Sequence, residues 1–231
     1  MIASVFAFTL LSFAQRPDEQ VRAEIEKALS KDKIKLQVSF QGGTATLKGQ
    51  ARNIFQKNRA LEIALGQPEV QNADADIEIA MPESDQKLGE EVVKEIRKYS
   101  RFTVFDDCSA FIKEGKVAVF GWVTEPYKKT EIEKRLHKII GIQEFKNDIE
   151  VLPVSLSDQR LRDTLASRLY GDSTFSDFAS MPIPPIHLIV SGSRVIITGV
   201  VGNQLQKQKA ESIIRGTPGV LSVESRLRIE S

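Results

Sequence analysis

Cysteine, histidine and tryptophan are scarce in this chain, whose 231 residues include one cysteine, two histidines and one tryptophan. The lone Cys108 has no partner for an intramolecular disulfide. His137 and His187 lie far apart in the sequence, and no His/Cys cluster has the spacing of metal ligands. No segment resembles a nucleophile elbow. We therefore expect a protein with no enzymatic activity, no metal and no cofactor.

An excess of either charge is also lacking, because 32 basic residues face 31 acidic ones and the formal net charge is +1. Nucleic-acid binding relies on a basic field that neutralises phosphates, so we expect no nucleic-acid partner. Any anion must be bound by a local patch. The hydrophobic share of 41% and the charged share of 27% are ordinary for a globular protein. The length allows one to three small domains.

No apolar run reaches the roughly 20 residues that a membrane-spanning helix needs. Residues 2–14 are uncharged and almost wholly apolar, and they end in Ser12-Phe13-Ala14, whose small residues suit a signal peptidase. We predict a signal peptide at residues 1–14, cleaved after Ala14, and hence a periplasmic or secreted protein without a cysteine-linked lipid anchor. No Lys or Arg precedes the run, so an atypical signal and a start placed too far downstream both stay open. A buried N-terminal strand or helix is the alternative.

A glycine follows an apolar strand three times in the sequence, at Gly49, Gly121 and Gly199. Apolar residues then recur at the same distances from each glycine. They are Val70, Ile77 and Ile79 in the first copy, Ile142, Ile149 and Val151 in the second, and Val220, Leu227 and Ile229 in the third. Shared spacing of this kind predicts tandem copies of one structural unit. We place the units at residues 17–80, 84–152 and 155–231.

Each unit opens with an aspartate, Asp18, Asp85 or Asp158, followed by apolar residues every three to four positions, which predicts a helix. The aspartate suits an N-cap or first-turn position. A strand hairpin, a second helix and a closing strand follow. We expect the second helices at about Asn53–Leu65, Pro126–Ile140 and Gln204–Arg215. The predicted fold class is α+β, with three αββαβ units that each pack a small three-stranded mixed sheet against two helices. The units differ in length between the first helix and the strands, where we expect a surface loop.

These units resemble the BON family, named for bacterial osmotically induced periplasmic and nodulation proteins. The third unit carries the resemblance in Val195, Ile197, Gly199, Val201, Ala210, Gly219, Val220 and Val223. The second carries it in Val117, Val119, Gly121, Val123, Gly141 and Ile142. The first is the most divergent, with Ala51 and Glu69 in place of the usual valine and glycine. The resemblance implies non-enzymatic modules of the periplasm or envelope, several of them associated with phospholipid binding, envelope integrity and osmotic stress.

The glycine that precedes the second helix has two interpretations. A helix N-terminus can bind phosphate, but a phosphate loop needs several glycines, or a Lys-Ser/Thr at the helix start. We therefore favour an architectural glycine, which ends a strand or permits a bulge or a close backbone approach. Asp106, Asp107 and Cys108 form an acidic cluster that we expect in a loop, where the acids disfavour a reactive thiolate.

The basic second helix of the middle unit is the candidate binding site. We expect contact with anionic phospholipid through basic side chains and two aromatic side chains that suit a membrane interface. The candidates are Trp122, Tyr127, Lys128, Lys129, Lys134, Arg135 and Lys138. A solvated helix face with local ion pairs is the alternative for the lysines, and buried packing is the alternative for Trp122. A protein-interaction scaffold that docks an envelope protein or another copy through strand edges or apolar faces is the alternative function.

Overall fold

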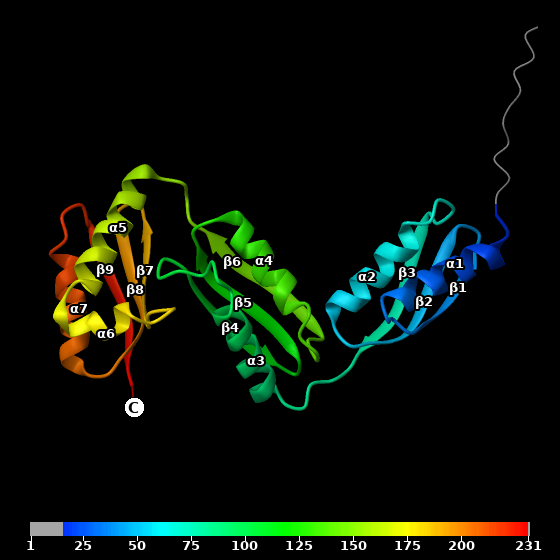
Figure 1. The fold of residues 1–231 in the computed structure, drawn as a ribbon, viewed down its shortest axis with the longest axis horizontal. Coiled ribbons are helices and arrows are strands. Elements are labelled where there is room, and N and C mark those ends of the chain that lie inside the picture. The colour runs from blue at the N-terminus through cyan, green and yellow to red at the C-terminus, as the bar shows by residue number, and fades with distance from the viewer. Residues whose placement is uncertain (1–15, 231) are drawn as a thin grey trace, which may run out of the picture. The chain divides into compact units, whose positions relative to one another are not determined.

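The computed structural model describes residues 16–230, so the predicted signal peptide at residues 1–14 lies outside the described residues. Three αββαβ repeats follow one another along the chain (Figure 1). They fall into two compact units, one that ends at Ile79 and holds the first repeat apart from Asn53–Phe55, and one that holds those three residues and the second and third repeats from Ala80 onward. The predicted fold class is confirmed, since each repeat has its own three-stranded mixed sheet.

In every sheet the middle strand pairs antiparallel with the strand before it and parallel with the strand after it. The parallel pair needs a crossover, which the second helix of each repeat supplies. The first repeat contains α1 (Asp18–Lys31), β1 (Leu36–Gln41), β2 (Thr44–Ala51), α2 (Ile54–Leu65) and β3 (Asn72–Ile79).

The second repeat follows the same order, but its second helix is shorter than predicted. The repeat contains α3 (Asp85–Arg97), β4 (Asp107–Lys113), β5 (Lys116–Val123), α4 (Pro126–Leu136) and β6 (Glu144–Val151). The prediction extended α4 to Ile140. The chain leaves the helix earlier because the amides of Lys138 and Ile139 bond to the carbonyls three residues back, which tightens the last turn.

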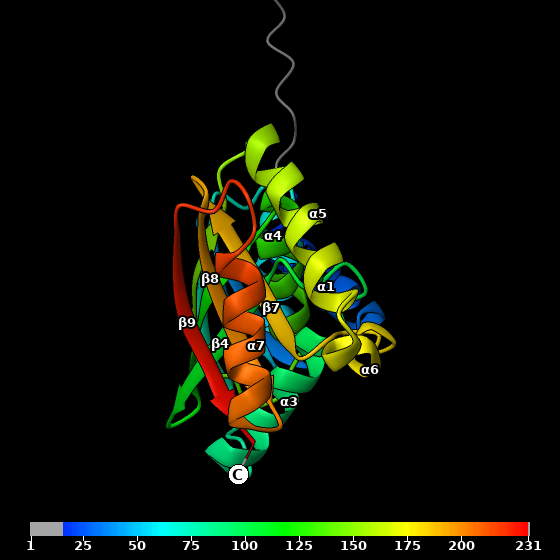
Figure 2. The same ribbon diagram turned by 90° about the vertical axis from the view of Figure 1, so that its left-hand side faces the viewer.

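The third repeat has the longest connection between its first helix and its sheet. Two short helices, η1 (Ser173–Phe175) and α6 (Ser176–Ala179), precede the prolines there. The remaining elements are α5 (Leu156–Tyr170), β7 (Ile186–Ser191), β8 (Arg194–Val201), α7 (Gln204–Arg215) and β9 (Ser222–Ile229). Figure 2 shows α5 and α7 together on one side of this sheet. The opposite face of each sheet carries no helix of its own repeat, and we call it the open face.

The repeat aspartates tie a helix to a hairpin in the second and third repeats. The Asp85 carboxylate accepts hydrogen bonds from the amides of Glu114 and Gly115 at 2.7 and 2.9 Å. Asp158 does the same for Gly192 and Ser193 at 2.8 and 2.9 Å. Both aspartates lie in the first helical turn, which is one of the two positions predicted for them. The N-cap, the other predicted position, is a serine in both helices. The aspartate therefore fixes the β-hairpin turn over the helix start.

The repeat glycines lie inside strands rather than at their ends. β2, β5 and β8 each continue for two residues beyond the glycine, so the strand-end interpretation is wrong. Gly121 and Gly199 have φ angles of 127° and 115°, and a Cβ there would lie 2.1 Å from the Asp107 carbonyl oxygen and 1.9 Å from that of Pro185. Only glycine permits this approach of two backbones, which confirms the architectural interpretation.

Candidate functional site

The predicted contact residue Lys128 is buried, which corrects the expectation that it lies at a surface. Its side chain is 5% exposed, and its Nζ lies 2.6 Å from a carboxylate oxygen of the fully buried Asp106. The same ammonium donates to the Thr124 hydroxyl at 2.8 Å. Lys128 begins the stripe Lys128, Ile132, Leu136 that α4 buries. It is a core ion pair and cannot reach a lipid.

Asp106 organises a network that the sequence did not reveal. Its carboxylate accepts from the amides and hydroxyls of Thr103 and Thr124, all at 2.8–3.1 Å, besides the bond from Lys128. The expected loop holds for Asp106, which precedes β4, but not for Asp107 and Cys108, which begin that strand. Burial raises the pKa of the Cys108 thiol, and the charges of Asp107 and Asp106 raise it further. The thiolate form is therefore disfavoured, for the reason that the acidic neighbours suggested.

Two of the other four candidate cations in and after α4 are already paired. Lys134 lies 3.3 Å from Glu131, and Arg135 lies 2.6 Å from Glu95 with its guanidinium also over the Tyr99 ring. Lys129 is half-buried and Lys138 is exposed. The helix surface is therefore close to the solvated, ion-paired face that was the alternative interpretation.

The two aromatic candidates lie in different surroundings. Trp122 is on the open face of the second sheet, where its indole Nε1 donates to Glu150 at 3.3 Å and the Arg226 guanidinium of the third repeat lies 5.2 Å from its ring centroid. Tyr127 is 44% exposed at the start of α4, with Arg101 over its ring at 5.4 Å. Trp122 therefore packs between repeats, and Tyr127 is the aromatic residue that solvent reaches.

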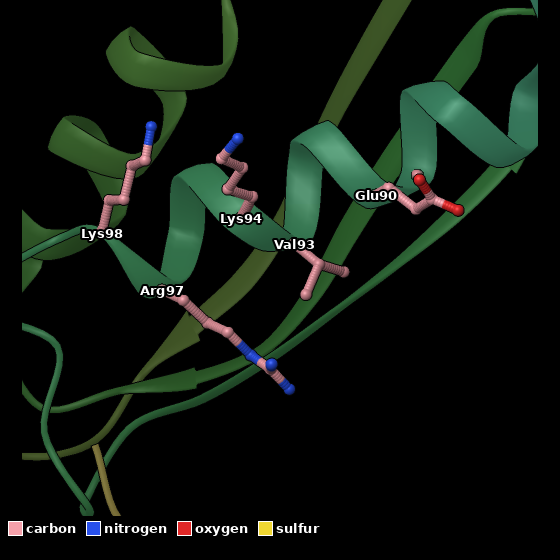
Figure 3. Close-up of a pocket in the computed structure, with 6 residues that line it drawn as sticks. Glu90, Val93, Lys94, Arg97 and Lys98 are labelled. Atoms are coloured by element: carbon pink, nitrogen blue, oxygen red, sulfur yellow. The ribbon is translucent and has the colours of Figure 1, made fainter. Parts of the chain in front are cut away.

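A shallow, open depression of about 600 Å³ lies on the outer side of α3, and its lining residues come from that helix and Lys98. Gly89 and Val93 give it an apolar floor, and Val93 is 42% exposed. Figure 3 shows Lys94 and Lys98 projecting to one side of the helix and Val93 and Arg97 to the other. We call the set Gly89, Val93, Lys94, Arg97 and Lys98 the α3 basic groove.

The three cations of the α3 basic groove have no ion-pair partner within residues 16–230. Glu90 is the one acid in the groove lining, and Glu95 is engaged by Arg135 on the other side. Cations at a helix C-terminus also interact favourably with the helix dipole, which accounts for part of their placement. Lys94 and Lys98 therefore offer two unpaired cations on one side of α3, and Arg97 offers a third beside exposed Val93 on the other side.

Sequence reasoning missed this groove, although a signal was present. Lys94, Arg97, Lys98 and Arg101 recur every three or four residues at the end of α3 and just beyond it, although the basic run of α4 is denser. Pairing decided between the two helices, because the acids that neutralise α4 come partly from another element. Such cross-element pairs are not visible in a one-dimensional charge pattern.

Other classes of site find no support in the residues that the structure describes. Among them, no cluster of three or more His, Cys, Asp or Glu side chains could hold a metal ion. No helix within the same range combines the length and apolarity needed to cross a bilayer.

The solved structures that resemble this chain have low sequence identities and low TM-scores. CdsD, described as a structural protein of the type III secretion system of Chlamydia trachomatis, is 14% identical, with 91% of this chain and 92% of that chain covered and a TM-score of 0.27. The periplasmic domain of the inner membrane protein PrgH from S. typhimurium is 12% identical, with 88% and 100% covered and a TM-score of 0.23. These values carry no argument about function. No curated protein matches the chain.

The model of one family, the BON domain, matches residues 17–81 and 157–231. The first repeat, which looked the most divergent, is matched in full, while the second lies outside the matched ranges. The second repeat nevertheless has the same element order and strand register as its neighbours. The two matches cover more than half of the sequence. The chain therefore belongs to the BON domain family.

Proposed function

We propose that this chain is a non-enzymatic, exported protein that binds anionic phospholipid at the cell envelope, in envelope maintenance or osmotic stress. Membership of the BON family supports a binding rather than a catalytic role. The apolar run at residues 2–14 supports a periplasmic or secreted location. The observation that carries the proposal is the α3 basic groove, in which unpaired Lys94, Arg97 and Lys98 border an exposed apolar floor.

The chemistry of the groove suits a lipid headgroup. Phosphate oxygens accept hydrogen bonds from guanidinium and ammonium groups, while Val93 offers apolar contact to the glycerol and first acyl carbons. Each Lys or Arg near an anionic leaflet contributes about 1 kcal/mol, so three of them contribute about 3 kcal/mol, or roughly a hundredfold in affinity. Binding of this strength weakens with salt, because exposed charges are screened within about 10 Å at 0.1 M.

Tyr127 extends the surface beyond the groove. Arg101, which follows the groove cations along the chain, stacks on the Tyr127 ring and links the end of α3 to the start of α4. A half-exposed tyrosine with its ring against a cation is amphipathic and suits the headgroup layer. The exposed Tyr127 of the sequence-predicted site therefore extends this surface, while Lys129, Lys134 and Lys138 on and after α4 are the separate set that the comparison variant removes.

Vesicle flotation of the mature chain tests the lipid class. We expect co-flotation with vesicles that contain phosphatidylglycerol and loss of co-flotation at 0.5 M salt. Vesicles of phosphatidylcholine alone are the control for apolar attraction and should leave the chain at the bottom of the gradient. Absence of binding to both compositions at low salt would refute the proposal.

A further inference from the structure

The open face of the second sheet carries two exposed aromatic side chains, one of which, Phe120, also lines a hollow that it shares with Arg226 of the third repeat. Phe111 on β4 is 62% exposed, and Phe120 on β5 is 46% exposed. Phe111 pairs with Ala118, two residues from Phe120, so the two rings are diagonal neighbours on one face, with Cβ atoms about 7–8 Å apart. The solvated face of a sheet is usually polar, and exposed apolar patches mark interaction sites.

The other two repeats show which residues occupy this face when it is solvated and when it is covered. The first repeat has Ser39 and Lys48 at the positions of Phe111 and Phe120, and both are exposed. The third repeat has Ile189 and Thr198 there, and they are only 2% and 6% exposed. The open face of the second sheet is thus apolar, like the covered face of the third sheet, but exposed, like the solvated face of the first sheet.

The cover of the third sheet comes from the second repeat. The amide of Leu188 on β7 donates to the Val104 carbonyl at 2.7 Å, and the Phe102 ring lies edge-on to His187 with centroids 5.8 Å apart. Trp122 and Leu152 face Ile189 across a hollow between the two sheets. This chain therefore already uses an open sheet face as a docking surface for another repeat.

The charges around the exposed rings are mixed in sign. Lys116 pairs with Glu144 at 2.5 Å and Lys146 with Asp148 at 2.8 Å, on the strand that borders the rings. Lys113 adds a further cation at the other edge. A face of one sign would repel a copy of itself, whereas alternating signs can meet their opposites across a twofold axis.

We propose that the open face of the second sheet, centred on Phe111 and Phe120, binds the same face of a second copy of this chain. The face continues at Trp122 into the existing contact with the third repeat, so the copy would extend an established interface. Three strands about 4.8 Å apart, of seven, eight and eight residues at about 3.3 Å per residue, offer at most about 370 Å² per copy. The two copies together would bury at most about 740 Å², below the roughly 1,200–2,000 Å² of stable specific interfaces, so the dimer is weak and concentration-dependent.

Sedimentation equilibrium of the mature chain from about 5 to 500 µM tests this pairing. The mean mass should rise from one chain toward two over the series. The double variant F111S/F120K, which carries the residues of the first repeat, should stay monomeric, with the dissociation constant raised at least about a hundredfold by loss of two exposed rings from each copy. Because both side chains are exposed, the variant should keep the circular dichroism spectrum of the parent.

The control variant L205Q removes an apolar side chain of similar exposure, 73%, from α7, away from the sheet face. It should dimerise as the parent does. A parent chain that stays monomeric throughout, or a dimer that F111S/F120K leaves unchanged, would overturn the proposal. An association that L205Q weakens equally would show non-specific apolar contact and would overturn it as well.

Discussion

Replacing Asp106 with alanine removes the centre of the buried network in the second repeat. The carboxylate is fully buried and accepts five hydrogen bonds, one of them from the ammonium of Lys128. The variant leaves a buried cation without its counter-charge and four further donors without an acceptor. Breaking a buried pair in this way costs about 3–5 kcal/mol, which is a large part of the 5–15 kcal/mol that stabilises a typical domain.

Lys128→Met is the matched comparison, because methionine keeps most of the aliphatic length. Asp106 then retains its four bonds from Thr103 and Thr124. We expect a loss of only about 1–3 kcal/mol, as for removal of one charged hydrogen bond. In the double variant Asp106→Ala/Lys128→Met the unpaired ammonium is gone, so the total loss should be smaller than the sum of the two single losses.

Urea unfolding followed by tryptophan fluorescence measures these free energies. Trp122 is the one tryptophan of the chain and lies on β5 of the same repeat, so its emission reports on the relevant unit. A loss below about 1 kcal/mol for Asp106→Ala, or strictly additive losses in the double variant, would refute the view that this pair is a coupled element of the core.

Three further perturbations test the fold. Gly121→Ala should lower the free energy of unfolding by roughly 2 kcal/mol or more, because the new Cβ meets backbone atoms. Gly49→Ala should cost less, because the new Cβ there meets the movable Leu36 side chain. Equal losses in urea titrations would contradict the close backbone approach at Gly121. Burial lowers the pKa of His187 below its ordinary value of about 6.5, so the unfolded state takes up the proton first and stability should fall as pH drops from about 7 to 5. His187→Gln should flatten this fall without abolishing it, since burial also lowers the pKa of His137; an unchanged pH profile would count against the assignment. Burial raises the pKa of the Cys108 thiol, so a thiol reagent at pH 8 should label the native chain at least about tenfold more slowly than the urea-unfolded chain, and equal rates would show that the thiol is accessible.

The repeat architecture could be predicted because the same core positions recur three times. Val117, Val119 and Val123 face the helices in the second sheet, as the corresponding residues do in the others. Alternation in a strand and a 3.6-residue period in a helix depend only on local geometry, so element type and order followed from spacing. The end of α4 was placed too late because the tightened turn at Lys138 and Ile139 has no distinctive sequence signal.

The candidate site was predicted less well because it depends on partners that are distant in the sequence. The burial of Lys128 had a signal in its place on the stripe with Ile132 and Leu136, but its counter-charge, Asp106, comes from 22 residues upstream. Trp122 could be assigned to the open face from alternation alone. The contact between its ring and Arg226 of the third repeat could not be predicted, because it depends on how one repeat packs against the next.

Flotation of two matched triple variants on phosphatidylglycerol vesicles tests the central claim most directly. K94Q/R97Q/K98Q removes the cations of the α3 basic groove, and K129Q/K134Q/K138Q removes the same number of charges from α4 and the turn after it. We predict that the first variant loses roughly a hundredfold in affinity at low salt. The second should stay within about tenfold of the parent, since Lys134 is paired with Glu131 and Lys129 is half-buried, which leaves Lys138 as its one exposed cation without an ion pair among the described residues. Equal losses in the two variants, or unchanged binding by the first, would contradict the assignment of lipid binding to the α3 basic groove.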